Sequence, residues 1–226
     1  MRVAATPRPS TRKIASRYDK WSRFYDLADT IGPLGRQERK WRARVAERVR
    51  DMEGWALDAG CGTCRMAEEL QRVCFKGRLL AVDASRKMVK RAQRKVGVLG
   101  LRGLVVLGDV SRLPLRPGCL DAVICTFSIT TVAKPQDAIW EFERALRAGG
   151  RLILLDSEAP SGMLARLLYH MLVPLSRFFC HTYIDRDISG LLQAAGGLGR
   201  EFKATFLGGM VCLYEHKKRA DPGIHE

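Results

Sequence analysis

Long hydrophobic runs are absent from this sequence of 226 residues. No apolar run reaches the roughly 18 residues that a membrane-spanning helix needs, so no spanning helix is predicted. The first 17 residues are basic but contain no apolar stretch, which argues against a secretory signal there. Apolar residues make up 46% and charged residues 28% of the chain, a composition that excludes a mostly disordered protein.

Histidine is scarce, and cysteine occurs in an odd number. The four histidines, at positions 170, 181, 216 and 225, show no metal-ligand spacing, and no metal site is predicted. Several of the seven cysteines lie inside apolar runs, which indicates buried thiols in a reducing compartment and favours a cytoplasmic location. Cys61 and Cys64 have C-x-x-C spacing, but no second pair or nearby histidine completes a redox or zinc motif.

Acidic residues are few compared with basic ones. The chain has 39 Lys and Arg against 24 Asp and Glu, a formal net charge of +15. Such a surface attracts phosphate on nucleic acid or on anionic lipid. Residues 85–95 hold six basic residues, no acid and no aromatic, so the stacking platforms of RNA-binding proteins are missing and nucleic acid is not favoured. Peripheral membrane contact stays open beside the alternative of a basic, soluble enzyme with a solvated helix face.

Five short apolar runs organise the chain, and helix-length segments separate several of them. The runs cover residues 55–58, 78–83, 103–108, 120–127 and 150–156, and helices are expected over 36–50, 65–73, 85–96 and 135–146. This alternation predicts an α/β fold, a doubly wound and mostly parallel sheet. A helix over 185–195 and a closing hairpin over 202–216 complete it. We expect a mobile basic arm (1–13), one domain (14–218) and a tail (219–226).

A glycine turn follows the first predicted strand and opens a helix. It reads Leu57-Asp58-Ala59-Gly60-Cys61-Gly62-Thr63-Cys64. Gly60 and Gly62 would let a nucleotide approach the backbone closely. Asp83 closes the second strand, where a carboxylate can accept hydrogen bonds from ribose hydroxyls. Asp109 closes the third, where it can accept from an adenine amino group. The alternative is that these aspartates only cap the helices that follow.

The charge around this turn distinguishes two classes of nucleotide. A dinucleotide places its pyrophosphate at the helix N-terminus, and Asp58 directly before the turn would repel it. The third glycine of the dinucleotide fingerprint would fall near Arg65 and is absent. A carboxylate suits the ammonium of a methionyl group, so S-adenosylmethionine is favoured as cofactor. A nicotinamide-dependent oxidoreductase and an RNA-associated methyltransferase are the rival interpretations.

The order of these motifs resembles that of the class I S-adenosylmethionine-dependent methyltransferases. Within them the chain resembles the ubiquinone/menaquinone biosynthesis C-methyltransferase family, which is related to phospholipid N-methyltransferases. The resemblance covers roughly residues 14–218. It rests on Tyr18-Asp19 and Tyr25-Asp26, on the segments LDAGCGTC, AVDAS, GDVSRLPL and ALRAGGRLILLDSEAP, and on the terminal FLGGMVCLYEHKK.

The resemblance implies a Rossmann-like seven-stranded sheet whose last strand is antiparallel. It also implies cofactor contacts from eight residues: Asp58, Gly60, Gly62, Thr63, Asp83, Asp109, Val110 and Thr126. The chain departs from the family at two places. Cys64 stands where the family usually has glycine, and Thr130-Thr131 stands where the quinone enzymes tend to carry an Arg-Asn pair.

The acceptor is expected to be small or lipid-like, a quinone-like ring carbon or a phospholipid amine. An N-terminal helical cap and a helical segment over 160–195 are expected to cover it. Residues 163–179 are densely apolar and could instead lie at a membrane interface, pack on the sheet or form a homodimer contact. If a proton must be removed from the acceptor, His181, Tyr183 and Asp156 are the candidate bases.

Overall fold

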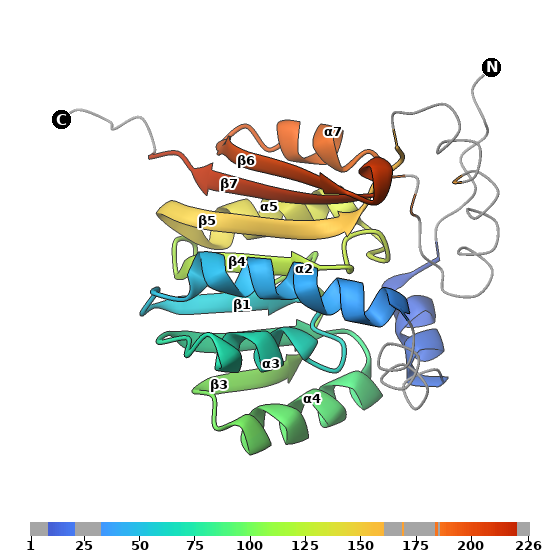
Figure 1. Cartoon of the computed structure of the whole chain (residues 1–226), viewed down its shortest axis with the longest axis vertical. Helices are drawn as coiled ribbons and strands as arrows, with labels where there is room; N and C mark the ends of the chain where they lie inside the picture. The colour runs from blue at the N-terminus through green and yellow to red at the C-terminus, as the bar shows by residue number, and fades with distance from the viewer. Residues whose placement is uncertain (1–8, 21–32, 161–168, 170–183, 185, 221–226) are drawn as a thin grey trace.

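The computed structural model describes residues 9–20, 33–160, 169, 184 and 186–220. Their centre is a seven-stranded sheet of order β3-β2-β1-β4-β5-β7-β6 (Figure 1). The pairs between β3 and β5 are parallel, and β7 pairs antiparallel with both β5 and β6. The predicted Rossmann-like, doubly wound sheet with an antiparallel last strand is confirmed.

The strands lie close to the apolar runs of the sequence. Their bounds are β1 Trp55–Ala59, β2 Arg78–Asp83, β3 Gly103–Leu107, β4 Leu120–Thr126, β5 Leu146–Ser157, β6 Leu198–Phe206 and β7 Val211–Lys218. The helices are α2 Pro33–Val49, α3 Arg65–Arg72, α4 Arg86–Leu99, α5 Pro135–Ala145 and α7 Ile188–Gln193, with a short 3-10 turn, η1 Leu207–Gly209, between β6 and β7. Residues 11–20 form a further helix.

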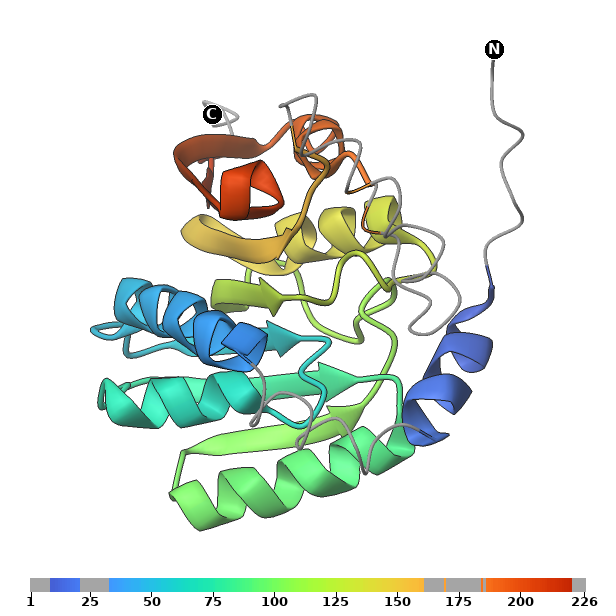
Figure 2. The ribbon, with the colours of Figure 1, turned by 45° about the vertical axis from the view of Figure 1, so that its right-hand side comes forward.

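Helices cover both faces of the sheet, as Figures 1 and 2 show. One core packs α2, α3 and α4 against one face, and a second packs α5 and α7 against the other. The helical period explains the packing of α2, because Trp41, Val45 and Val49, four residues apart, are all buried. Ala122–Cys125 of β4 and Leu152–Leu155 of β5 are buried at every position, so the sheet is covered on both faces there and these stretches are continuously apolar.

The structure adjusts the predicted boundaries. The N-terminal helix begins at residue 11, so the last three residues of the predicted arm are helical. Residues 21–32 and most of 161–185 lie outside the described residues, including much of the predicted cap and of the 160–195 segment. Strand β5 begins at Leu146, earlier than predicted, because Leu120 pairs with Leu146 across a bulge. Within the described ranges, no helix is long and apolar enough to cross a membrane.

Candidate cofactor site at the carboxyl ends of the strands

A cavity lies at the carboxyl ends of β1, β2, β3 and β4. Chain order reverses here, because β2 and β3 extend the sheet on one side of β1 and β4 extends it on the other. Ligands of open α/β sheets bind at such a switch point. The residues that line the cavity come from the glycine turn, the strand ends and the helix at 11–20, and include Ile14, Tyr18, Gly60, Gly62, Asp83, Ser85, Met88, Asp109, Val110, Phe127, Ser128 and Thr131.

Gly60 and Gly62 are required in the turn for different structural reasons. Both have positive φ, +71° at Gly60 and +54° at Gly62. A Cβ at Gly60 would come within 1.8 Å of Ser128 Oγ, whereas a Cβ at Gly62 would meet no protein atom within 4 Å. Packing against Ser128 therefore requires glycine at position 60. At position 62 the space beside the backbone is open, as a closely approaching ligand would need.

Cys64, the departure from the family's glycine, keeps the backbone conformation that glycine favours. Its φ of +60° and ψ of +49° are left-handed, at the N-cap of α3, and a side chain in that region carries strain. The thiol is buried, and its Sγ lies 3.8 Å from Asp58 Oδ2. Cys64 thus keeps the backbone conformation of a glycine in the turn, and its buried side chain lies next to Asp58.

Asp83 stands in the cavity with both carboxylate oxygens anchored to the backbone. Oδ2 accepts from the Gly62 N–H at 2.8 Å, and Oδ1 accepts from the Ser85 N–H at 2.8 Å. Burial raises the pKa of Asp83, and these two bonds partly oppose the rise. Each carboxylate oxygen can accept a second hydrogen bond, so the fixed carboxylate retains the capacity to accept from two ribose hydroxyls.

Asp109, which follows the neighbouring strand β3, is held in a similar way. Oδ1 accepts from the Ser111 backbone N–H at 2.9 Å and from the Ser111 hydroxyl at 2.7 Å, and Oδ2 accepts from Thr11 Oγ1 at 2.7 Å. Burial favours a higher pKa, but the bonds from Ser111 and Thr11 hold the pKa of Asp109 below its usual value. The neighbouring Val110 is buried and also lines the cavity.

Three of the eight predicted cofactor residues, Asp58, Thr63 and Thr126, are not among the described residues that line the cavity. Asp58 and Thr63 are buried behind the turn, and Thr126 is half-buried at the end of β4. Burial raises the pKa of Asp58 to about 7, although the positive charge of Arg42 opposes the rise. The Asp58 carboxylate lies 3.8 Å from the Cys64 thiol of the turn.

Sequence reasoning missed Phe127 and Arg42. Phe127 follows β4 with a φ of +52° and lines the cavity. Backbone strain in an aromatic residue costs about 1–3 kcal/mol and concentrates at functional sites. The Arg42 guanidinium, from α2, lies 5.0 Å from the Phe127 ring centroid and 3.1 Å from Glu38. No local pattern marks Arg42, because it is one of many basic residues on an amphipathic helix.

Of the three candidate bases, the structure describes only Asp156. His181 and Tyr183 lie outside the described residues. Asp156 is 1% exposed, and its oxygens accept from the Thr130 hydroxyl at 2.8 Å, the Thr130 N–H at 3.2 Å and the Ser157 N–H at 2.7 Å. Burial raises its pKa against these bonds. Asp156 is not among the described residues that line the cavity, and its contacts join the loop after β4 to the end of β5.

The helix at 11–20 closes one side of the cavity, and it includes Tyr18 of the expected N-terminal helical cap. Ile14 and Tyr18 line the cavity. Asp19 Oδ1 accepts from the Ser85 hydroxyl and from the Lys87 N–H at the start of α4. Together with the bond from Thr11 to Asp109, these contacts join the helix to the ends of β2 and β3.

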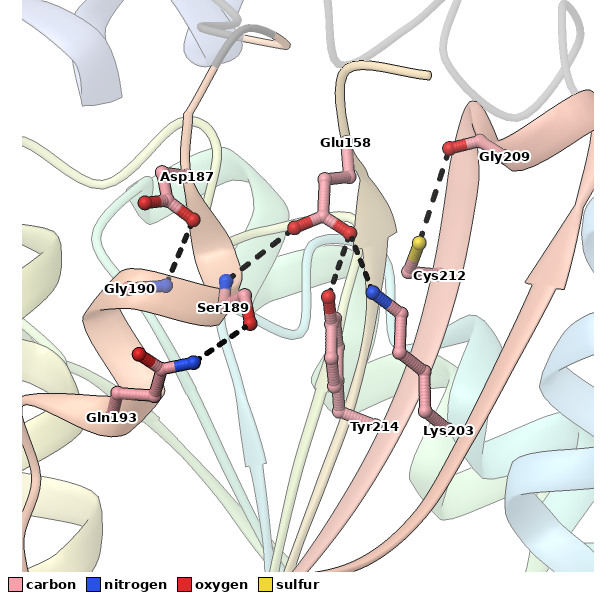
Figure 3. Close-up of polar contacts among 9 residues, drawn as sticks. All are labelled: Glu158, Asp187, Ser189, Gly190, Gln193, Lys203, Gly209, Cys212 and Tyr214. Atoms are coloured by element: carbon pink, nitrogen blue, oxygen red, sulfur yellow. Dashed lines mark hydrogen bonds and ion pairs between the residues drawn. The ribbon is translucent and has the colours of Figure 1, made fainter. Parts of the chain in front are cut away.

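A second polar cluster lies beyond the end of β5 (Figure 3). Glu158 Oε2 accepts from the Tyr214 hydroxyl at 2.6 Å and lies 3.5 Å from Lys203 Nζ, while Oε1 accepts from the Ser189 N–H at 3.4 Å. These partners belong to β7, β6 and α7. The Glu158 carboxylate therefore ties three elements to the end of β5.

Comparisons with known proteins agree with this geometry. A family model described as a methyltransferase domain matches residues 57–154. A demethylmenaquinone methyltransferase of Mycobacterium tuberculosis (strain H37Rv) is 32% identical over 166 residues, 70% of this chain and 64% of that protein. A ubiquinone/menaquinone biosynthesis C-methyltransferase UbiE of Syntrophotalea carbinolica is 33% identical over 165 residues, 72% of this chain and 65% of that protein.

Two solved structures show the same fold. The [4+2]-cyclase SpnF superposes with a TM-score of 0.78 at 15% identity, over 97% of this chain and all of that one. A geranyl diphosphate methyltransferase in complex with GPP and sinefungin superposes with a TM-score of 0.70 at 16% identity, over 92% of this chain and 99% of that one. At such identities the likeness concerns the fold alone, and the chemistry must be argued from the site.

The sheet order, the switch-point cavity and the family match place this chain among the class I S-adenosylmethionine-dependent methyltransferases. Within that class it is similar to demethylmenaquinone methyltransferases and to UbiE, in agreement with the resemblance seen in the sequence. The matched region spans 64% of the length of the mycobacterial relatives.

Proposed function

We propose that this protein transfers a methyl group from S-adenosylmethionine to a ring carbon of a small, quinone-like acceptor. The observation that carries the proposal is the cavity at the switch point, where Gly62, Asp83 and Asp109 face one space from three successive strand ends. The relatives' names, demethylmenaquinone methyltransferase and UbiE, supply the acceptor class.

The residues present fit the cofactor. Gly62 leaves open space beside the backbone, and Asp83 has a fixed carboxylate with acceptor capacity left for ribose hydroxyls. Asp109 would accept from the adenine amino group, and Val110 would pack against the ring. Asp58 and Thr63 would hold the turn in shape from behind. The bound cofactor supplies an electrophilic methyl group on a sulfonium.

This chain's own contribution is alignment and exclusion of water. Displacement at a sulfonium methyl is in-line, so most of the acceleration comes from holding the acceptor carbon opposite the sulfur. Ile14 and Tyr18 from the helix at 11–20, with Phe127 after β4, would form apolar walls around that space. Apolar walls expel water and strengthen the electrostatic interactions inside the site.

The wall next to Phe127 is small and uncharged. Thr131, Val132 and Ala133 line the cavity there, and Thr131 Oγ1 donates to the Ser128 carbonyl at 2.7 Å. The quinone enzymes tend to carry Arg-Asn at positions 130 and 131, whereas Thr130 here is bound to Asp156. We therefore expect an acceptor that this chain recognises by shape and apolar contact more than by charge.

Radiolabelled methyl transfer tests the proposal. The purified protein would be incubated with labelled S-adenosylmethionine and, separately, with a short-chain demethylmenaquinone, a crude lipid extract and total RNA. We expect label on the demethylmenaquinone and in the quinone fraction of the extract. Label in the phospholipid fraction alone would redirect the proposal to an amine acceptor, and label in RNA alone would overturn it.

A further inference from the structure

The positive charge of the protein is concentrated on one helical face. Helices α2, α3 and α4 lie side by side on the same face of the sheet (Figures 1 and 2). Helix α4 contains six basic residues and no acidic one, and α2 contains six basic and two acidic residues. Helix α5, on the opposite face, contains one basic and three acidic residues. We call the exposed surface of α2, α3 and α4 the basic face.

Packing orients these charges toward solvent. The apolar residues of α4, including Met88, Ala92 and Val96, are buried, so most of the basic residues between them face solvent. The exposed cations of the basic face include Arg36, Lys40, Arg44, Lys87, Lys90 and Arg94. Val98, in the last turn of α4, is 87% exposed.

We propose that the basic face docks on an anionic lipid surface. This inference rests on the proposed function, because a quinone-like acceptor is lipid-like and would reside in a bilayer. Ser85 and Met88, at the beginning of α4, line the cofactor cavity. Lys87 and Lys90 follow within the next turn. Docking of the basic face would therefore bring one wall of the cavity close to the bilayer surface, where a lipid-like acceptor resides.

A lipid surface fits the basic face better than a nucleic acid does. Single-stranded RNA is held by aromatic side chains on which bases stack, together with a charged groove. The one aromatic residue in α2, α3 and α4 is Trp41, which is 2% exposed. An anionic bilayer attracts clustered cations through its negative surface potential. The exposed Val98 adds an apolar side chain that can enter the interface.

Charge removal on the basic face tests the proposal. Each cation near an anionic bilayer strengthens binding by about fivefold. The combined variant Lys40→Gln, Lys90→Gln and Arg94→Gln should therefore bind vesicles of phosphatidylcholine and phosphatidylglycerol about a hundredfold more weakly than the wild type. Cosedimentation with these vesicles measures the partition. Vesicles of phosphatidylcholine alone should bind neither protein, and added salt should release the wild type.

A matched variant controls for net charge and for folding. Arg116→Gln, Arg200→Gln and Arg219→Gln together remove the same charge from exposed positions outside α2, α3 and α4. This control should bind anionic vesicles within about threefold of the wild type, since its basic face is intact. Equal weakening in the two triple variants would overturn the proposal, and so would wild-type binding to single-stranded RNA in preference to the vesicles.

The outcome separates this inference from the proposed function. Both triple variants should methylate a detergent-solubilised short-chain demethylmenaquinone at the wild-type rate, because no substituted residue lines the cavity. Vesicle binding without methyl transfer by the wild type would contradict the proposed function and leave the docking face standing. Methyl transfer with no preference for anionic vesicles would contradict the docking face alone.

Discussion

Asp83 is the residue through which the proposed cofactor site can be tested most directly. Its carboxylate accepts one hydrogen bond from the Gly62 N–H and one from the Ser85 N–H, both at 2.8 Å, and would accept from the cofactor's ribose. The variant Asp83→Asn keeps the shape of the side chain but replaces one acceptor oxygen with a donor and removes the charge.

The expected loss follows from the chemistry of that bond. A hydrogen bond to a charged group contributes about 1.5–3 kcal/mol, so losing one bond to a ribose hydroxyl should raise the dissociation constant roughly 10- to 150-fold. Because burial raises the pKa of Asp83, the affinity of the wild type should also fall as acid protonates this carboxyl. The asparagine variant has lost the titrating group, so its affinity should vary less with pH.

Isothermal titration with S-adenosylhomocysteine measures the affinity, and thermal unfolding of the free protein measures the change in the fold. Asp121→Asn is a suitable control. Asp121 Oδ2 also accepts from a backbone N–H, that of Trp55, at 2.8 Å, but it lies near the beginning of β4, away from the cavity. The control should lose some stability and keep the wild-type affinity.

An unchanged affinity in Asp83→Asn, with thermal stability close to that of the wild type, would refute the ribose role. A parallel loss of affinity in Asp83→Asn and Asp121→Asn would refute it as well. That result would mean that the general loosening of the sheet, and not the contact with ribose, weakens binding.

Three further predictions concern other parts of the structure. The pKa of Asp58 rises from 3.8 to about 7, so wild-type stability falls as pH rises through that window, because the unfolded chain ionises Asp58 while the folded protein keeps it protonated. Urea unfolding should therefore show Asp58→Asn gaining up to about 4 kcal/mol relative to wild type between pH ~4 and pH ~7. Parallel pH profiles of the two proteins would contradict this. Gly60→Ala should destabilise the fold because its Cβ would clash with Ser128, whereas Gly62→Ala should lower the free energy of unfolding by only about 1–2 kcal/mol yet abolish S-adenosylhomocysteine binding. Calorimetry measures the stability of each variant, and titration measures its affinity for the ligand. Equal losses of stability and of affinity in the two variants would contradict the open space beside Gly62. Burial favours a higher pKa for Glu158, but its hydrogen bonds hold the pKa below the usual value. Its stabilisation is therefore present at neutral pH and lost as acid protonates the carboxyl of the folded protein. In urea unfolding, Glu158→Gln should be about 1–3 kcal/mol less stable than wild type at pH ~7, and the difference should shrink as the pH falls.

The fold followed from local patterns in the chain. The runs at 78–83 and 120–127 are apolar at most positions, which is typical of strands buried on both faces, and β2 and β4 occupy these positions. The spacing of Trp41, Val45 and Val49 likewise identified the buried stripe of α2. Residues near one another in sequence carry these signals, so no knowledge of distant contacts was needed. The ends of the strands were harder to predict from local patterns. The start of β5, for example, depends on the pairing of Leu146 with Leu120 of β4.

The sequence by itself determined the turn after β1 and the acidic residues that close β2 and β3, because glycine geometry and the meeting of parallel strand ends at one edge are local rules. Only the tertiary structure decided which side chains face the cavity. Asp58 lies behind the turn and Asp156 is bound to Thr130, while Thr11 reaches Asp109 across 98 positions of sequence. Such contacts depend on strand order and helix packing, which bring together residues that no local pattern connects.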